Sequence, residues 1–158
     1  MTVSAEDVLD LAKQRGVMIA TAESCTGGLI AGALTDIPGS SAVFDRGFVT
    51  YSNEAKAEML GVDMALIETH GAVSRPVAEA MAAGALDESN AAITVSVTGV
   101  AGPGGTLAKP EGMVCFGIAT ANGIRSETQR FGAIGRHQVR AETVNHALKL
   151  LLNGMANL

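Results

Sequence analysis

Short apolar runs alternate with amphipathic segments along this 158-residue chain, and this order constrains its fold more than any other feature. The runs have the length and β-branched content of strands, whereas the segments between them show the apolar spacing of helices. Such an order predicts an α/β domain. Strands are expected at 17–21, 43–51, 93–98, 113–121 and 124–131. Helices are expected at 4–16, 28–36, 53–61, 63–69, 75–89 and 136–152.

The composition favours one folded domain over residues 1–158. Hydrophobic residues make up 47% of the chain and charged residues only 17%, which argues against a disordered protein. Four Phe, one Tyr and no Trp indicate an aliphatic core with close approach between elements. No repeat, linker or low-complexity segment marks a second domain.

Charge and cysteine usage exclude several classes of partner. The net charge is −5 and no run of Lys or Arg is present, so we expect no nucleic-acid binding. No stretch reaches the length of a membrane span, and the N-terminal segment lacks the apolar run of a signal peptide. Cys25 and Cys115 have no ligand-like spacing. We therefore expect a soluble cytoplasmic protein without a metal or cofactor.

The stretch TAESCTGG (21–28) lies between an expected strand and an expected helix. A hydroxyl group placed there meets unpaired backbone N–H groups and the positive end of the helix dipole. The same groups can stabilise the oxyanion that forms when an amide is attacked. Ser24 is thus a candidate nucleophile, although Ser24 or Thr26 as a simple helix cap is the alternative interpretation.

The segment 47–56 ends at Lys56, in the first turn of an expected helix. Most helix lysines are solvated. If this helix points at Ser24, burial would lower the pKa of Lys56 and let its amine accept the serine proton. Tyr51 either packs as an amphipathic side chain or donates its hydroxyl to the same site.

A glycine-rich turn follows the expected strand 93–98, from Thr98 through Gly99 and Gly102 to Thr106. Such a turn can wrap backbone N–H groups around a phosphate, but it matches neither the Walker nor the dinucleotide fingerprint. Arg136 and Arg140 lie one helical turn apart and are either phosphate ligands or solvated side chains.

Four stretches together resemble the CinA C-terminal domain family, also called the competence/damage-inducible family. They are TAESCTGG (21–28), GSSAVFDRGFVTYSNEAK (39–56), HGAVSRPVAEAMA (70–82) and SVTGVAGPGG (96–105). Their order and spacing also agree with the family, so the resemblance extends over nearly the whole chain. Matches of this length are highly specific.

The resemblance implies a three-layer α/β/α sandwich with a central mixed sheet, assembled into dimers or larger homo-oligomers. It also implies a nicotinamide-nucleotide amidase of pyridine nucleotide salvage that needs no metal. The reaction would convert nicotinamide mononucleotide to nicotinate mononucleotide and ammonia. By position, Ser24 would be the nucleophile, Lys56 its base and Tyr51 an assisting group.

A small-molecule nucleotide is thus the expected partner, and its binding residues are expected in the same segments. The candidates are Glu23, Cys25, Thr26, Gly27, Gly28, Ser41, Thr98, Gly99, Gly102, Arg136 and Arg140.

Two other interpretations remain open at this point. Cys25 adjoins Ser24 and is an alternative nucleophile, but His70, His137 and His146 all lie in or next to expected helices, so no histidine has an obvious place beside it. The chain would alternatively be a non-catalytic nucleotide-binding or regulatory module linked to competence or the response to DNA damage.

Overall fold

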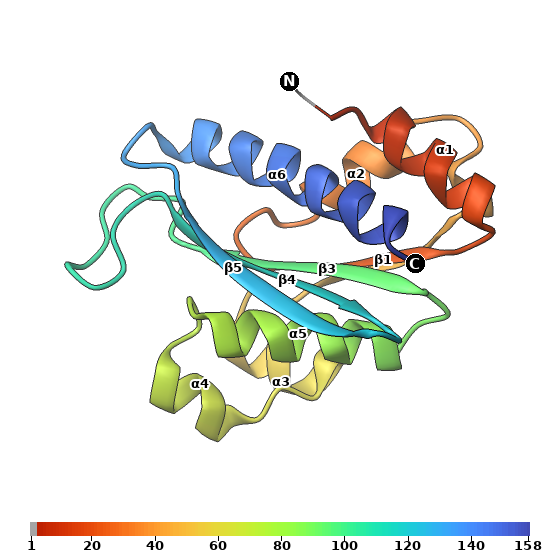
Figure 1. Cartoon of the computed structure of the whole chain (residues 1–158). Helices are drawn as coiled ribbons and strands as arrows, with labels where there is room; N and C mark the ends of the chain where they lie inside the picture. The colour runs from red at the N-terminus through yellow and green to blue at the C-terminus, as the bar shows by residue number, and fades with distance from the viewer. Residues whose placement is uncertain (1–2) are drawn as a thin grey trace.

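A computed structural model describes residues 3–158, and its centre is a five-stranded mixed sheet (Figure 1). The strands lie in the order β2-β1-β3-β4-β5. Three of them are parallel, namely β1 (Ile19–Glu23), β2 (Phe44–Val49) and β3 (Ile93–Gly99). The other two, β4 (Met113–Thr120) and β5 (Gly123–Arg130), complete the sheet as antiparallel neighbours.

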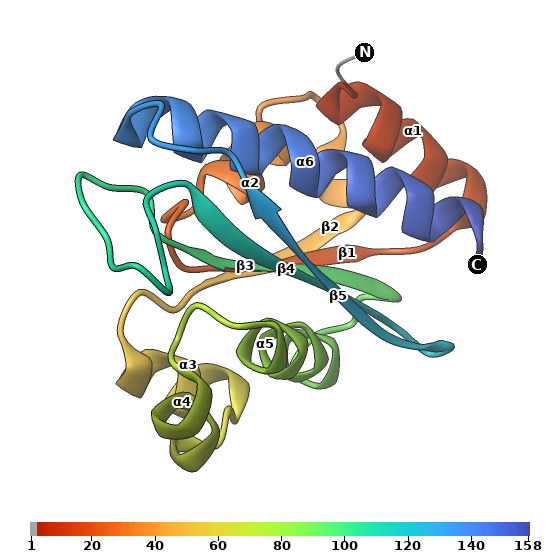
Figure 2. The same cartoon turned by 60° about the vertical axis from the view of Figure 1, so that its left-hand side comes forward.

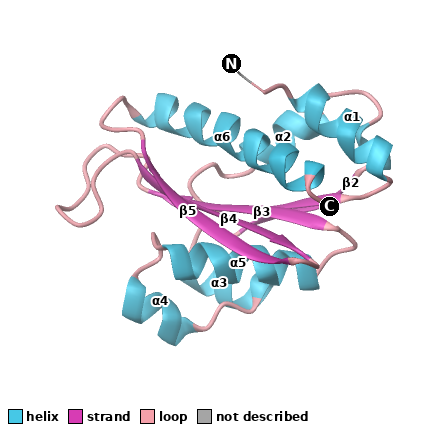
Figure 3. Ribbon diagram, in the orientation of Figure 1, coloured by secondary structure: helices cyan, strands magenta, loops and turns pink. Residues whose placement is uncertain are grey.

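Helices cover both faces of this sheet, as Figures 1 and 3 show. One face carries α1 (Ala5–Arg15), α2 (Leu29–Thr35) and α6 (Arg136–Ala156). The opposite face carries α3 (Asn53–Leu60), α4 (Met64–His70) and α5 (Arg75–Asp87). The expected three-layer α/β/α sandwich with a mixed sheet is confirmed. Within residues 3–158 no helix combines the length and apolarity that a membrane crossing requires.

Local sequence signals explain most helix boundaries. The Ser4 side chain accepts a hydrogen bond from the N–H of Asp7, and Gly16 ends α1 in the left-handed region at φ 65°. Ser74 caps α5 in the same way and is followed by a proline in the first turn. These expected caps are confirmed, because each depends only on residues that are neighbours in the chain.

The sheet separates two apolar layers. The larger one lies under α1, α2 and α6 and includes Leu9, Ile30 and Phe116, all at most 1% exposed. The smaller one lies between the sheet and α3–α5 and includes Leu60 and Met81. Burying each side chain of this size stabilises the fold by ~1.5–3 kcal/mol. β3 and β4 are both buried, and for β4 this explains a near-continuous apolar run. In β3 the apolar residues alternate with Thr94, Ser96 and Thr98, whose buried hydroxyls donate to backbone carbonyl oxygens.

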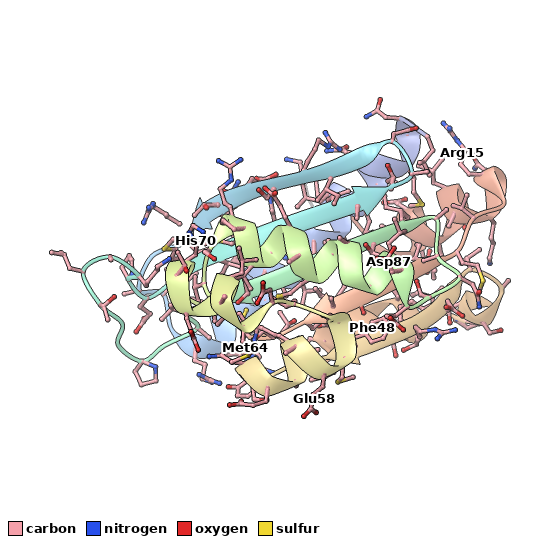
Figure 4. All side chains as sticks on the ribbon, turned by 90° about the horizontal axis from the view of Figure 1, so that it is seen from below. Arg15, Phe48, Glu58, Met64, His70 and Asp87 are labelled. Atoms are coloured by element: carbon pink, nitrogen blue, oxygen red, sulfur yellow. The ribbon has the colours of Figure 1, made fainter. Side chains whose placement is uncertain are left out.

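Two glycines let α5 approach its neighbours closely. A Cβ atom on Gly117 of β4 would lie 2.4 Å from the carbonyl oxygen of Ala78, and one on Gly84 would lie 2.0 Å from that of Leu60. Figure 4 shows α3, α4 and α5 over this face, with Glu58 of α3 pointing away from the body. The contact at Gly84 therefore sets the position of α3 on α5.

Four elements differ from their expected bounds by two or more residues. β2 ends at Val49 and not at residue 51, α5 ends at Asp87 and not at residue 89, and β1 ends at Glu23 and not at residue 21. β1 begins at Ile19 and not at residue 17, because the N–H of Val17 is bonded to Ala12 at the end of α1. α6 continues to Ala156 and not only to residue 152. Its last turn packs Gly154 against Ile93 and buries Met155, a tertiary contact that no local signal announces. Beside this turn, Arg15 donates to the carbonyl oxygens of Leu158 and Ala156.

Candidate active site

The three sequence clusters meet where the parallel strands end. Ser24 follows β1 directly, Tyr51 lies just beyond β2, and the glycine-rich loop begins at the end of β3. The register pairs Glu23 with Val49 and with Val97, so the ends of these strands are level with one another. In Figure 2 the loop between β3 and β4 extends beyond the sheet on the side where α6 begins. This end of an α/β sheet is a common place for chemistry.

Lys56 and Ser24 form a hydrogen-bonded pair. The Nζ atom of Lys56 lies 3.1 Å from Ser24 Oγ and 2.9 Å from the carbonyl oxygen of Thr50. Lys56 is only 1% exposed, and burial lowers the pKa of its amine, an effect that a smaller interaction with Cys25 opposes. An amine that is neutral at moderate pH can accept a proton from a serine hydroxyl.

Local structure delivers Lys56 to this position. The N–H of Thr50 continues the pairing of β2 with β1 by donating to the carbonyl oxygen of Glu23. Ser52 then caps α3 by accepting from the N–H of Ala55. The helix therefore starts immediately beyond the sheet edge, and Lys56 in its first turn faces the end of β1.

The turn from Ser24 to Gly28 is held by backbone contacts. The N–H of Ser24 donates to Val97 of β3, and the N–H of Gly27 donates back to Ser24. Gly27 and Gly28 have φ values of 58° and 109°, which side chains rarely adopt. Neither Ser24 nor Thr26 caps α2, whose N-cap is Gly28 without a side-chain bond. The simple capping interpretation of these two residues is therefore wrong.

Glu23 takes the capping role instead. Its side chain is fully buried, and its carboxylate accepts from the N–H groups of Ile30 and Ala31, each at 2.9 Å. The same carboxylate accepts from the Thr26 hydroxyl at 2.6 Å. These partners lie within the fold, so Glu23 shapes the nucleophile turn and is not placed to touch a substrate. The sequence expectation for Glu23 is corrected on this point.

Unused donors remain in the same turn. Among the hydrogen bonds of residues 3–158, none uses the backbone N–H of Cys25, Thr26 or Gly28. Backbone N–H groups beside a nucleophile are suitable donors to an oxyanion. The turn thus combines a serine hydroxyl with free N–H groups.

The Cys25 thiol is a poor alternative nucleophile. It is 6% exposed, and burial raises its pKa to about 11, so the reactive thiolate is disfavoured at neutral pH. His146 is bonded to Glu127 on β5, not to this cysteine. Within the described residues no group of three His, Cys, Asp or Glu side chains is placed to hold a metal ion.

Both arginines of α6 reach the site from above the sheet. Arg140 donates to the carbonyl oxygens of Cys25 and Thr26. Arg136 donates to the carbonyl oxygen of Gly102 at 2.7 Å and to the hydroxyl of Tyr51 at 3.1 Å. The Tyr51 ring itself is 62% exposed. Arg136 therefore links the segment that follows β2 to the glycine-rich loop.

The glycine-rich loop packs around the carboxylate of Glu111, a residue of the same segment. The N–H of Gly104 donates to the Glu111 carboxylate at 2.8 Å, and a Cβ on Gly102 would lie 2.5 Å from that carboxylate. A Cβ on Gly99 would lie 2.6 Å from Val114. The hydroxyl of Thr98 donates to the carbonyl oxygen of Ala72. These residues thus have structural partners, and the Gly104 N–H is not free for a phosphate.

Ser41 is not brought to this site. It is an exposed residue of the short 3-10 turn Ser40–Ala42, which precedes β2. Ser24 follows the end of β1, and the two strands are parallel, so Ser41 and Ser24 lie at opposite ends of the sheet. The expectation that Ser41 belongs to the same site is corrected by this topology.

Comparison with known sequences identifies the family. The family model described as CinA C-terminal domain matches residues 1–155. A CinA-like protein of Chlorobaculum tepidum is 53% identical over 152 residues, which are 93% of this chain and 36% of that protein. The chain thus spans about a third of the length of such relatives. The nicotinamide-nucleotide amidohydrolase PncC of Escherichia coli K12 is 50% identical over 92% of this chain and 89% of its own length.

Solved structures agree with this assignment. The competence/damage inducible protein CihA of Agrobacterium tumefaciens is 51% identical and superposes with a TM-score of 0.87, covering 97% of this chain and 99% of its own. A CinA superfamily protein of Klebsiella pneumoniae is 34% identical, with a TM-score of 0.90 and 98% of both chains covered. The resemblance drawn from the four sequence stretches is confirmed, and the chain belongs to the CinA C-terminal domain family.

Proposed function

We propose that this protein is an amidohydrolase that converts nicotinamide mononucleotide to nicotinate mononucleotide and ammonia through a Ser24–Lys56 dyad. The observation that carries the proposal is the buried Lys56 amine, 3.1 Å from the Ser24 hydroxyl at the strand ends. The similarity to the Escherichia coli PncC, named a nicotinamide-nucleotide amidohydrolase, supports the choice of substrate. The reaction would serve pyridine nucleotide salvage in the cytoplasm, with the protein as a homo-oligomer.

Acylation begins with proton transfer from Ser24 Oγ to the neutral amine of Lys56. The Oγ atom bonds to the carboxamide carbon, and the carbonyl π electrons move to its oxygen. The free N–H groups of the nucleophile turn donate to this oxyanion. When the oxyanion collapses, the C–N bond breaks and Lys56 returns the proton to the departing nitrogen. Ammonia leaves and a nicotinoyl ester on Ser24 remains.

Deacylation repeats these steps with water as the nucleophile. The amine of Lys56, neutral again, accepts a proton from a water molecule that attacks the ester carbon. Collapse of the second oxyanion breaks the C–O bond to Ser24, and Lys56 returns the proton to Oγ. The new carboxylic acid gives its remaining proton to solvent, so nicotinate mononucleotide leaves as the carboxylate, and the dyad is restored.

Recognition of the nucleotide is assigned to the rim of the site. Arg136 is exposed and keeps N–H groups beyond the two that bind Gly102 and Tyr51, so it is our candidate ligand of the substrate phosphate. The exposed Tyr51 ring offers a face for the positively charged pyridinium ring of the substrate. No cofactor is required by this chemistry.

Ammonia release from nicotinamide mononucleotide by the purified protein tests the proposal. Ser24→Ala should lower kcat by at least about 10³-fold, because the covalent route is lost, while the melting temperature stays near that of the wild type. Cys25→Ala is the matched comparison, since it removes the neighbouring thiol and keeps the backbone N–H. An active Ser24→Ala variant, or inactivity confined to Cys25→Ala, would reject Ser24 as the nucleophile. An inactive wild type would favour a nucleotide-binding module.

A further inference from the structure

The guanidinium group of Arg140 holds two consecutive carbonyl groups of the nucleophile turn. Its Nε donates to the carbonyl oxygen of Cys25 and its Nη2 to that of Thr26, each at 3.1 Å. The two donors belong to one rigid planar fork, so they fix two peptide planes together. A fork of this kind suits a phosphate or carboxylate, but here the backbone next to Ser24 occupies it.

Peptide geometry then determines where the Thr26 N–H points. The peptide between Cys25 and Thr26 is trans, so its N–H is directed opposite to the carbonyl group that Arg140 binds. Arg140 approaches from α6 on one face of the sheet, whereas Lys56 approaches from α3 on the other face (Figure 1). The Thr26 N–H is therefore directed away from the guanidinium group of Arg140.

The remaining polar groups of Thr26 are already engaged. Its hydroxyl donates to the buried Glu23 carboxylate, and its carbonyl oxygen accepts from Arg140. Thr26 is fully buried, and no hydrogen bond of residues 3–158 uses its N–H. A Cβ on Gly27 would make only an ordinary contact with Nη2 of Arg140, at 3.5 Å, and the need for glycine there comes from its φ of 58°. The backbone N–H is therefore the one donor of Thr26 that has no partner within the described chain.

We propose that Arg140 is a positioning residue that orients and polarises the Thr26 N–H as a donor to the oxyanion. This inference rests on the proposed amidohydrolase function. When Ser24 Oγ bonds to the amide carbon, the negative charge on the former carbonyl oxygen meets this N–H. Arg140 acts through the backbone and does not touch the substrate.

The competing role for Arg140 is the phosphate ligand that the sequence indicates. A phosphate ligand binds nicotinamide mononucleotide but has nothing to bind in nicotinamide riboside. Its loss would raise KM for the nucleotide and erase the preference for the nucleotide over the riboside. A residue that positions an oxyanion donor acts on the transition state of both substrates. Its loss would lower kcat for both and leave their ratio unchanged.

The experiment compares wild type, Arg140→Ala, Arg140→Lys and the control Gln138→Ala, an exposed neighbour on α6. The values of kcat and KM are measured with both substrates, and acetylation of Ser24 by p-nitrophenyl acetate is followed by mass spectrometry. Arg140→Ala should lose about 10- to 100-fold in kcat and in acetylation rate, with KM within about threefold of wild type. Millimolar guanidinium should restore part of the loss, and Gln138→Ala should match wild type.

Other results would overturn the proposal in distinct ways. A raised KM for the nucleotide alone, at unchanged kcat, assigns Arg140 to the phosphate. If the wild type hydrolyses neither amide, the proposed function fails. The rate of Ser24 acetylation then still tests the role of Arg140, because equal acetylation rates in wild type and Arg140→Ala reject the positioning role. If Arg140→Ala melts below the assay temperature, Arg140→Lys takes its place, because lysine keeps the charge without the fork. Its kcat, KM and acetylation rate are compared with those of the wild type in the same way.

Discussion

The amine of Lys56 lies between two oxygen atoms of different kinds. The carbonyl oxygen of Thr50 only accepts hydrogen bonds, whereas the hydroxyl of Ser24 both donates and accepts. A neutral amine, with two N–H bonds and a lone pair, satisfies both neighbours. An ammonium group would bring a third N–H and a buried charge into the same space. The geometry thus suits the unprotonated form, the direction in which burial moves the pKa of Lys56.

Replacing Lys56 separates its role as a base from its charge. Arginine keeps the charge but does not lose its proton in proteins, so Lys56→Arg should be about as inactive as Lys56→Ala. In the wild type, kcat/KM should rise with pH through the lowered pKa of Lys56, because only the neutral amine accepts the serine proton. The pH profile of ammonia release and both variants check this. Substantial turnover by Lys56→Arg would mean that the base is another group.

The candidate catalytic residues were predicted from the sequence, but the role of Glu23 was not. Ser24, Lys56 and Tyr51 were expected at one site, and the structure brings them to the same end of the sheet. The capping role of Glu23 was missed because its partners lie seven and eight positions further on, across a turn whose path glycines set. A carboxylate that follows a buried strand and precedes a helix was the available signal.

At the scale of the element, α2 depends on a cap from outside its own first turn. The Glu23 carboxylate binds two of its unpaired N–H groups and the hydroxyl of Thr26. Glu23→Gln replaces one accepting carboxylate oxygen with an amide NH₂ group, which then faces a hydrogen-bond donor of the turn or of α2. Thermal or urea unfolding should show a loss of ~2–3 kcal/mol, with reduced activity from a loosened turn. Glu23→Gln with wild-type stability would show that this cap contributes little.

The contact between α3 and α5 links packing to catalysis. A Cβ on Gly84 would lie 2.0 Å from the carbonyl oxygen of Leu60, so Gly84→Ala must push α3 outward and carry Lys56 with it. We expect a loss of ~1–3 kcal/mol in stability and at least about tenfold in kcat. Gly32→Ala is the matched control, because this helical glycine has open space around its Cβ position. It should be neutral or slightly stabilising. Equal effects of both substitutions would contradict the steric argument.

Element boundaries were predictable where short-range chemistry sets them. The caps of α1, α3 and α5 follow from residues three apart in the chain. The last turn of α6 was not predictable, since it is stabilised by packing on Ile93, sixty-one positions before Gly154. Strand pairing was likewise set by the assembled sheet, in which β1 lies between β2 and β3.

At the scale of the whole molecule, the site combines segments that are far apart in the chain. Arg140 lies 115 positions from Cys25, and Arg136 lies 85 positions from Tyr51, yet both pairs are hydrogen-bonded. The sequence named these residues as candidates and left both arginines as either phosphate ligands or solvated side chains. It could not show that backbone carbonyl groups had already taken the fork of Arg140, because that depends on how α6 docks.

Two carboxylates predict how the whole fold responds to acid. Backbone hydrogen bonding from Asn90 lowers the pKa of Asp45. Burial alone would raise the pKa of Glu127, but hydrogen bonds from Gln129 and His146 outweigh it and lower that pKa. A carboxyl group whose pKa is lowered in the folded state stabilises the fold at pH values above its pKa in the unfolded chain. This stabilisation is lost as the pH falls through the pKa of the folded state. The melting temperature should therefore drop below about pH 4.5.

The variants Asp45→Asn and Glu127→Gln test this acid response one group at a time. Each should melt lower than wild type at pH 7 and lose less on acidification, measured by calorimetry between neutral and acid pH. Glu58→Gln is the control, because this exposed side chain points into solvent (Figure 4). Parallel acid curves for all the variants would show that these carboxylates do not govern the response.

The length of α6 has a practical consequence for tethering the protein. Its 21 residues extend about 30 Å at a rise of ~1.5 Å per residue, from Arg136 beside the strand ends to Ala156 near Arg15. A linker joined after Leu158 would therefore start on the far side of the molecule from Ser24. Immobilisation on a resin or fusion to a reporter through that end should leave the approach of a nucleotide to the dyad unobstructed.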